Sequence, residues 1–213
     1  MLRTLGVHII SCDELTSIQA LERKAATKPM RSGLVERREF EYIRHGTQSA
    51  IVSFDVASGQ VQHASIGKTR TEQDFVCHIR QTVANDPDAS WVFVVDQLNI
   101  HQSQGLVDLV AQLCELSDEV AERKAQGLLK AMINRAMFLS DPTHRISFVY
   151  TPKHTSWLNQ IEIWFSILVR RVIKRGNFTS VDDLRARILA FIDYFNQTAN
   201  PFKWTFTGRP LVA

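Results

Sequence analysis

The sequence is poor in cysteine and has no long apolar run, and both absences exclude classes of protein. Its three cysteines, Cys12, Cys77 and Cys114, form no Cys-x-x-Cys pair, so they predict neither a disulfide framework nor a zinc site. No stretch approaches the roughly 20 apolar residues of a membrane-spanning helix. The amino terminus leads almost directly into a strand-like segment, which does not fit a signal peptide. We therefore expect a cytoplasmic protein with reduced thiols and no membrane partner.

An excess of charge of one sign is also missing. The formal net charge is +3, which permits binding to nucleic acid but does not by itself indicate it. Internal repeats and low-complexity tracts are absent as well. An apolar content of 45% with 22% charged residues is typical of a folded domain, and 213 residues are enough for one domain with a sizeable core.

What the sequence does contain is an alternation of strand and helix patterns that predicts an α/β fold. The expected strands are residues 7–13, 40–56, 61–66, 91–95 and 146–150, and the expected helices are residues 71–85, 104–138, 158–174 and 181–196. The polar segment Glu14–Arg38 contains Pro29 and Gly33 and is predicted to be a long loop with a helical turn at Ile18–Lys24. An antiparallel hairpin followed by parallel strands matches the order of ribonuclease-H-like folds, with a mixed central sheet and flanking helices.

Three acidic residues stand where strands end or a helix begins. Asp13 ends the first predicted strand, Asp96 follows the apolar run Trp91–Val95, and Glu162 lies near the start of a strongly apolar helix. Functional groups gather at such positions in open α/β sheets, and carboxylate oxygens are the ligands that Mg²⁺ prefers. Two ions held by such a set can activate the attacking oxygen and stabilise the leaving oxygen of a phosphoryl displacement.

Each of these residues also has an interpretation without catalysis. An acid at the end of a strand occurs by chance in a chain with 22 acidic residues. Asn99 and His101 could orient Asp96 or contact phosphate, or they could serve only the turn after the strand. Glu162 lies beside the apolar face of its helix, where an unpaired carboxylate is costly. Its partner is then either a metal ion or an ordinary lysine or arginine.

Four segments, taken in order, carry a family resemblance. They are residues 11–23, which contain Cys-Asp13-Glu, residues 37–48, residues 94–101 with the run Val-Val-Asp96-Gln-Leu-Asn-Ile-His, and residues 151–165 with Leu-Asn-Gln-Ile-Glu162. Together they resemble the DDE-type catalytic domain of mariner-like insertion-sequence transposases of prokaryotes. The tail at residues 200–208 resembles the closing segment of the same family, so the resemblance spans nearly the whole chain.

The resemblance implies an activity, a metal and partners. Asp13, Asp96 and Glu162 are expected to be the catalytic triad that binds two Mg²⁺ ions, with Mn²⁺ able to substitute, and Glu14 is only a neighbour of Asp13. Members cleave double-stranded DNA at transposon ends, leave a 3′ hydroxyl, and join it to target DNA, usually at a TA dinucleotide. The expected assembly is a homodimer on DNA, and no small-molecule substrate is expected.

The chain departs from the family pattern in three respects. The separation between Asp96 and Glu162 is longer than in better-known members, which we interpret as a helical insertion at about residues 113–145. Many members carry Ser-Pro-Asp-Leu-Asn-Pro-Ile-Glu, whereas here Trp157 and Gln160 replace the aspartate and the second proline. Neither change removes a ligand. The amino-terminal helix-turn-helix region of such enzymes is absent, so residues 1–213 are expected to be the catalytic domain alone.

Basic residues predict where DNA would be contacted. The candidates are Arg23, Lys24, Lys28, Arg31, Arg37, Arg38 and Arg44 in the segment after Asp13, then His101 and Lys153, and Arg170, Arg171 and Lys174 at the end of the helix that carries Glu162. The first group is expected to lie near the metal site, where phosphate contacts are needed. For the last group a solvated helix end is the alternative, because cations favour a helix C-terminus on dipole grounds alone.

Two other functions are compatible with the same residues. A plain nuclease with a ribonuclease-H-like fold would cut DNA without strand transfer. A non-catalytic DNA-binding or dimerisation remnant of a decayed insertion element would retain the fold but need not retain all three acids.

Overall fold

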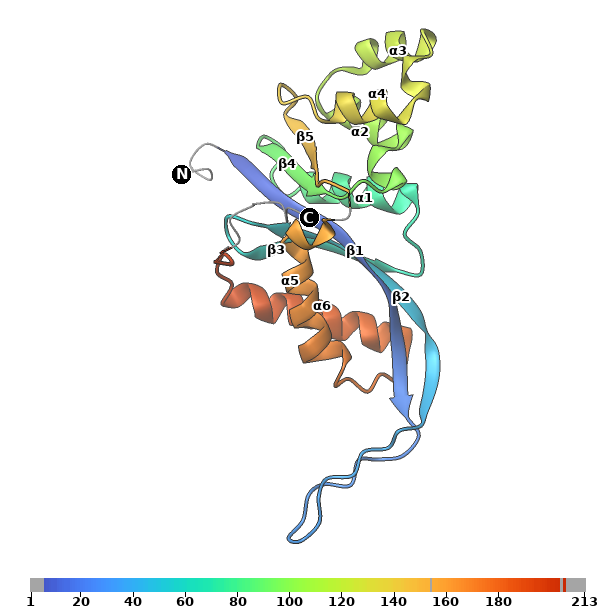
Figure 1. Ribbon diagram of the computed structural model, residues 1–213, viewed down its shortest axis with the longest axis vertical. Helices are drawn as coiled ribbons and strands as arrows, with labels where there is room; N and C mark the ends of the chain where they lie inside the picture. The colour runs from blue at the N-terminus through green and yellow to red at the C-terminus, as the bar shows by residue number, and fades with distance from the viewer. Residues whose placement is uncertain (1–5, 154, 204, 206–213) are drawn as a thin grey trace, which may run out of the picture.

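A five-stranded mixed sheet forms the centre of the computed structural model, which describes residues 6–153, 155–203 and 205 (Figure 1). Its strands are β1 (Val7–Arg23), β2 (Tyr42–Asp55), β3 (Gln60–Gly67), β4 (Ser90–Val95) and β5 (Ile146–Tyr150), in the order β3-β2-β1-β4-β5. The first three strands are antiparallel, whereas β4 and β5 run parallel to β1. The hairpin with parallel additions that the sequence predicted is therefore present. The predicted closing segment, residues 200–208, lies partly outside the described residues.

Helices cover both faces of this sheet. Helices α1 (Glu72–Val83) and α2 (Gln104–Leu113) pack on one face, and α5 (Ile161–Leu168) and α6 (Val181–Gln197) pack on the other (Figure 1). Two separate cores follow from this layering. Trp91 belongs to the core on the α1–α2 side, and Trp164 belongs to the core on the α5–α6 side. The arrangement confirms the predicted mixed sheet with flanking helices.

The segment between β4 and β5 is helical, as predicted, but it is broken into short pieces. After the 3₁₀ turn η2 (Asn99–Gln102) come α2, α3 (Ser117–Ala125), the turn η3 (Leu128–Lys130) and α4 (Met132–Leu139). The breaks fall where the backbone enters the left-handed region, at Glu115 and at Gly127. One amphipathic pattern over residues 104–138 therefore becomes three helices.

The predicted loop at residues 14–38 is wrong for residues 14–23, and so is the helical turn expected at residues 18–24, because β1 continues to Arg23 and pairs with β2 from Ile10 to Arg23. A bulge between Leu15 and Ile18, with Ser17 at φ 59°, explains why the alternation was hidden. The extra residue reverses the side-chain parity, so that Ile18 and the alternate positions after it join the α5–α6 core. Asp13 consequently lies in the middle of a long strand and not at its end.

Helix boundaries follow local capping. Thr71 forms the predicted capping box with Asp74 at the start of α1, and Ser180 caps α6 by accepting the N–H of Asp183. The helix that carries Glu162 begins at Ile161 and not at residue 158, after a 3₁₀ turn η4 (Ser156–Leu158). It ends in a π-helical turn, η5 (Val169–Ile173).

Beyond Arg23 and Tyr42 the hairpin narrows into an arm, residues 24–41, that extends away from the body (Figure 1). Isolated bridges join Lys28 to Arg37 and Arg31 to Leu34, so the two sides of the arm stay paired towards its tip. No helix among the described residues is long and apolar enough to cross a membrane.

Candidate active site

Asp13 lies in the middle of β1, on the sheet face that α5 covers. Its side chain is almost completely buried, and its Oδ1 accepts a hydrogen bond of 2.8 Å from the backbone N–H of Glu14. Burial raises the pKa of Asp13 to about 7; the negative charges of Glu14 and Asp96 add to this effect, while the hydrogen bond from Glu14 opposes it. Nearby positive charge would therefore be needed to keep Asp13 fully ionised at neutral pH.

Asp96 is the first residue after β4 and has one carboxylate oxygen fully engaged. Its Oδ1 lies 2.9 Å from the backbone nitrogen of Leu98 and 2.8 Å from Nδ1 of His101. Burial alone would raise the pKa of Asp96, but the hydrogen bonds from His101 and Leu98, with nearby positive charge, hold it below its ordinary value. Asp96 is therefore ionised at neutral pH.

Glu162 lies in the first turn of α5 and is partly buried. Its pKa is raised by burial and by the negative charge of Asp96. Asp96 acts on Asp13 in the same way, so the three predicted acids share one electrostatic environment. Within the described part of the chain, no lysine or arginine forms an ion pair with Glu162, so the alternative partner considered from the sequence is not found there.

Two residues hold the start of α5 against β1. Asn159 is fully buried; its side-chain nitrogen donates to the Cys12 carbonyl at 3.0 Å, and its Oδ1 accepts from the hydroxyl of Ser11. The same Ser11 oxygen accepts the backbone N–H of Ile161 at 2.8 Å, which satisfies one of the free donors at the helix start. These contacts fix the turn that carries Glu162 relative to the strand that carries Asp13.

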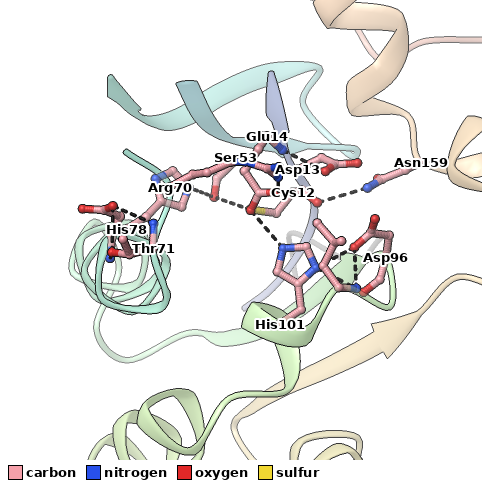
Figure 2. Close-up of polar contacts among 12 residues, drawn as sticks. Cys12, Asp13, Glu14, Ser53, Arg70, Thr71, His78, Asp96, His101 and Asn159 are labelled. Atoms are coloured by element: carbon pink, nitrogen blue, oxygen red, sulfur yellow. Dashed lines mark hydrogen bonds and ion pairs between the residues drawn. The ribbon is translucent and has the colours of Figure 1, made fainter. Parts of the chain in front are cut away.

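His101 lies between two acids and has no exposed surface (Figure 2). Its Nε2 is 3.0 Å from Oε1 of Glu14, its Nδ1 is 2.8 Å from Oδ1 of Asp96, and its ring packs on Phe75 with centroids 4.4 Å apart. The expectation that His101 contacts phosphate must be corrected, because its ring is enclosed and both nitrogens are engaged. The geometry supports the other interpretation, in which His101 orients Asp96.

Glu14 and Arg70 are residues whose importance the sequence did not reveal. Because successive side chains of a strand point to opposite faces, Glu14 lies on the α1 side while Asp13 lies on the α5 side. The Glu14 side chain is 1% exposed, and its Oε2 is 4.0 Å from a guanidinium nitrogen of the half-exposed Arg70. Adjacent acids at positions 13 and 14 were the only available signal, and nothing in the sequence connected Arg70 to them.

The basic residues after Asp13 are not beside the acids, contrary to expectation. Arg23, Lys24, Arg37, Arg38 and Arg44 lie on the outer part of the hairpin or on the arm. Arg23 lies ten positions beyond Asp13 along β1, a length of roughly 30 Å at about 3.3 Å per residue. Two of these cations also have acidic partners within the arm, since Lys24 pairs with Glu41 and Arg38 with Glu36.

The basic end of the Glu162 helix lines a groove. Arg170 and Arg171 on the π-helical turn, with Arg175, line a cavity of about 770 Å³ that is also lined by Tyr194 of α6 and by Phe202. Lys174 faces the opposite way, into a smaller cavity of about 320 Å³ beside β1. Lys153 is exposed in the loop after β5, two residues beyond Thr151, whose carbonyl accepts from the side chain of Gln97.

The fold defines a class. The crystal structure of a pre-cleavage Mos1 transpososome matches 91% of this chain and 49% of its own, with a TM-score of 0.50 at 11% identity. The Mos1 mariner paired-end complex with Mn matches 91% of this chain and 57% of its own, with a TM-score of 0.34 at 14% identity. The chain thus spans about half the length of these Mos1 chains. The mixed sheet with its flanking helices is a ribonuclease-H-like fold, as predicted.

The sequence then identifies the family. The family model of the DDE superfamily endonucleases matches residues 8–185, which include all three predicted acids, and the chain belongs to this superfamily. No curated protein sequence matches the chain. The resemblance to DDE enzymes that the four sequence segments indicated is therefore confirmed at the level of the family.

The donors present have the chemistry that hard divalent cations prefer. Asp13, Asp96 and Glu162 offer carboxylate oxygens only, and Asp13 and Glu162 both have raised pKa values that a nearby cation would lower. In the described part of the chain, no three His, Cys, Asp or Glu side chains form an arrangement that could hold a metal ion as it stands. The assignment of metal ligands to these acids stays a prediction.

Proposed function

We propose that this chain is the catalytic domain of a DDE transposase, which cleaves DNA at transposon ends and joins the resulting 3′ hydroxyl to target DNA. The proposal is supported by the positions of Asp13 on β1, Asp96 directly after β4 and Glu162 in the first turn of α5, where the negative charge of Asp96 acts on both other acids. Membership of the DDE superfamily supports it. Both steps are in-line displacements at phosphorus, so one site can serve them.

In this proposal the three acids hold two Mg²⁺ ions, for which Mn²⁺ can substitute. The ions would supply activation of the attacking oxygen and stabilisation of the leaving oxygen. The Oδ1 atoms of Asp13 and Asp96 accept backbone N–H groups, and within the described residues neither residue's Oδ2 has a hydrogen bond. The second oxygens therefore remain for ligands. Binding of cations would also compensate for the burial and the nearby negative charge that raise the pKa values of Asp13 and Glu162.

DNA contact is proposed for the cations that are exposed around these acids. Arg70 lies beside Glu14, Lys153 follows β5, and Arg170 and Arg171 line the groove at the far end of the same helix as Glu162. Contacts of this kind would position the phosphate backbone without reading its sequence, and their strength would fall steeply with salt. The basic residues of the arm would contact only DNA that extends beyond the sheet and its flanking helices.

A homodimer on DNA is part of the same proposal. The arm exposes large apolar side chains, among them Met30 at 76%, Val35 at 75% and Phe40 at 82%, which is unusual for a surface that stays in water. Sedimentation of the chain on duplex DNA, compared with a variant in which residues 27–38 are replaced by a short Asn-Gly turn, tests this part. The parent should form a two-protein complex that the shortened arm weakens; equal stoichiometry in both would remove the arm from the proposal.

The metal site is the first thing to test. Mn²⁺ would be titrated by calorimetry into the parent, Asp96→Asn and Glu162→Gln, with and without duplex DNA. Glu119→Gln, which removes an exposed carboxylate on α3, is the matched control. We expect both site substitutions, but not the control, to weaken binding. A parent that folds yet binds no Mn²⁺ even with DNA present would favour the non-catalytic remnant.

Strand transfer separates the transposase from a plain nuclease. An oligonucleotide with a free 3′ hydroxyl, incubated with supercoiled plasmid and Mn²⁺, should be joined covalently to the plasmid by the parent and not by Asp96→Asn. Plasmid nicking without joined product would instead indicate a ribonuclease-H-like nuclease. Location in the cytoplasm with the DNA remains a prediction from the sequence.

A further inference from the structure

Three polar contacts, joined through the residues Glu14 and His101, link Asp13 to Asp96. Neither Glu14 nor His101 belongs to the predicted triad. The backbone N–H of Glu14 donates to Asp13 Oδ1 at 2.8 Å. The Glu14 carboxylate lies 3.0 Å from Nε2 of His101, and Nδ1 of His101 lies 2.8 Å from Asp96 Oδ1 (Figure 2). These contacts therefore join β1 to the end of β4 behind the acids.

Glu14 and His101, which connect the two acids, both have buried side chains. The side chains of Glu14 and His101 are 1% and 0% exposed, and Phe75 covers the imidazole ring. A buried carboxylate is costly unless hydrogen bonds compensate it. The Tyr150 hydroxyl donates to the carbonyl of His101 at 2.9 Å, which fixes the backbone from which the ring projects. Such a ring has one orientation available to it.

We propose that Glu14 and His101 are positioning residues that hold the Asp96 carboxylate in the orientation required for cation binding. His101 and the Leu98 N–H together occupy Oδ1 of Asp96, which prevents rotation of the carboxylate and leaves Oδ2 as the oxygen for a ligand. Glu14 in turn keeps His101 in place from the adjacent strand. Outer partners of this kind set the orientation and affinity of metal-binding groups in other proteins.

This inference rests on the proposed function, because it assigns a role to residues behind the proposed cation site. It goes further in one respect: Glu14 acts through His101 and not as a neighbour of Asp13. Glu14 and Asp13 are consecutive in sequence but lie on opposite faces of the sheet. Asp13 would then be a cation ligand, and Glu14, the next residue of β1, would support a second ligand, Asp96.

The chain offers a matched control for each substitution. His78 is as buried as His101, but its ring nitrogens contact the hydroxyls of Ser53 and Ser65 and no acid. Glu22 lies on the same strand as Glu14 and also pairs with a histidine, His45, at 2.6 Å, but far from the acids. His101→Gln is therefore compared with His78→Gln, and Glu14→Gln with Glu22→Gln.

The experiment measures Mn²⁺ affinity by calorimetry, with Mn²⁺ electron paramagnetic resonance as a second readout, for the parent, these four variants and Asp96→Asn. We expect His101→Gln and Glu14→Gln to weaken Mn²⁺ binding roughly tenfold or more, with a changed resonance spectrum, while the two controls bind like the parent. Because Glu14→Gln keeps shape and one acceptor oxygen, it answers the question even if His101→Gln fails to fold.

The outcomes distinguish this inference from the proposed function. If the parent binds Mn²⁺ and Asp96→Asn abolishes it, but His101→Gln and Glu14→Gln match their controls, the positioning role is overturned and the metal site stands. If the parent binds no Mn²⁺ at all, the proposed function fails and this inference fails with it.

Discussion

Two buried histidines lie on the same side of the sheet, and they are opposites in chemistry. His78, on α1, contacts Ser53 at 2.8 Å and Ser65 at 2.9 Å, and burial together with the charge of His63 lowers its pKa well below the ordinary value. Burial would lower the pKa of His101 too, but the hydrogen bonds and charges of Asp96 and Glu14 raise it to about 9. Both residues are completely buried.

Burial alone therefore does not decide the pKa or the role of a histidine. Its hydrogen-bond partners do. The hydroxyl partners of His78 are neutral, so its surroundings form a closed polar cluster that needs nothing further, and we interpret it as structural. The partners of His101 are carboxylates that continue to Asp13 and towards Glu162. That pocket keeps an excess of negative charge, as a cation site would. Substitutions around the two rings should therefore differ in their effects on cleavage and on stability.

The largest effect is expected on cleavage. Asp13→Asn should reduce the rate of Mn²⁺-dependent DNA nicking by about 10²–10³-fold, because several kcal/mol of transition-state stabilisation convert at about 1.4 kcal/mol per tenfold. Ser53→Ala, which removes a partner of His78 on the neighbouring strand β2, should leave the rate within a few-fold of the parent. Plasmid relaxation at saturating Mn²⁺ measures both. Equal rates for parent and Asp13→Asn would contradict the assignment of Asp13.

The same substitution should act in the opposite direction on stability. The pKa of Asp13 is about 7 in the folded chain against 3.8 for an ordinary aspartate, so the folded state holds the proton more tightly. The contribution of Asp13 to stability is then greatest below about pH 4 and is lost as the pH rises towards 7. At pH 8 without metal, Asp13→Asn should unfold at higher urea, with a gain on the order of 2–4 kcal/mol.

Mn²⁺ provides a check on that stability gain. Mn²⁺ should raise the unfolding midpoint of the parent at pH 8, because it supplies the positive charge that the buried, ionised Asp13 lacks. It should have little effect on Asp13→Asn. A parent whose stability is indifferent both to Mn²⁺ and to pH between 4 and 8 would contradict the prediction.

The two histidines should next separate by the pH dependence of their contributions. His101 has a raised pKa, so its stabilisation is complete below about pH 6.5 and disappears as the pH rises through 9. The stability difference between parent and His101→Gln should therefore shrink by about 2–3 kcal/mol between pH 6.5 and 9. His78 has a lowered pKa, so the parent should lose its advantage over His78→Gln as the pH falls below 6.5. Urea unfolding across pH 5–9 measures both; parallel curves for the two variants would remove the contrast.

The smallest effect is expected at a third histidine, His45, which pairs with Glu22. His45 and Glu22 are 2.6 Å apart on the outer part of the hairpin, where both side chains keep more than a quarter of their surface in water. Because solvent screens such a pair, Glu22→Gln should change the free energy of unfolding by about 0–1 kcal/mol at pH 6. A larger loss would show that a histidine–carboxylate contact stabilises the chain even without enclosure.

Much of the fold could be predicted from the sequence because the signals are local. The apolar run Trp91–Val95, the capping box at Thr71 and the cap at Ser180 each depend on a few neighbouring residues, and the structure places elements where they predicted. The outer half of β1 was missed because the bulge at residues 15–18 reverses the alternation. Because this half of β1 was missed, the arm was not predicted either, and its cations were wrongly expected to lie near the acids.

The site was predictable only in part, for a different reason. Asp96 and Glu162 lie at a strand end and a helix start, positions that a sequence can reveal. The support around them comes from distant segments: Glu14 meets His101 across 87 positions, and Ser11 meets Asn159 across 148. No short-range pattern encodes such pairs. The sequence could single out His101 because it follows Asp96 by five positions. It could not show that Glu14 is the second partner of His101, nor that His78 contacts the hydroxyls of Ser53 and Ser65.

The contact of Ser11 with the start of α5 has a consequence for the order in which the chain acquires activity. Ile161, whose N–H Ser11 accepts, is made 150 positions after Ser11. Closing so long a loop is entropically costly, and contacts of this separation form late in folding. A nascent or partly folded chain therefore has Asp13 and Asp96 without a fixed Glu162. Under the proposed function, such a chain would lack the third acid of its cleavage site, so DNA cleavage would await the contact between Ser11 and the start of α5.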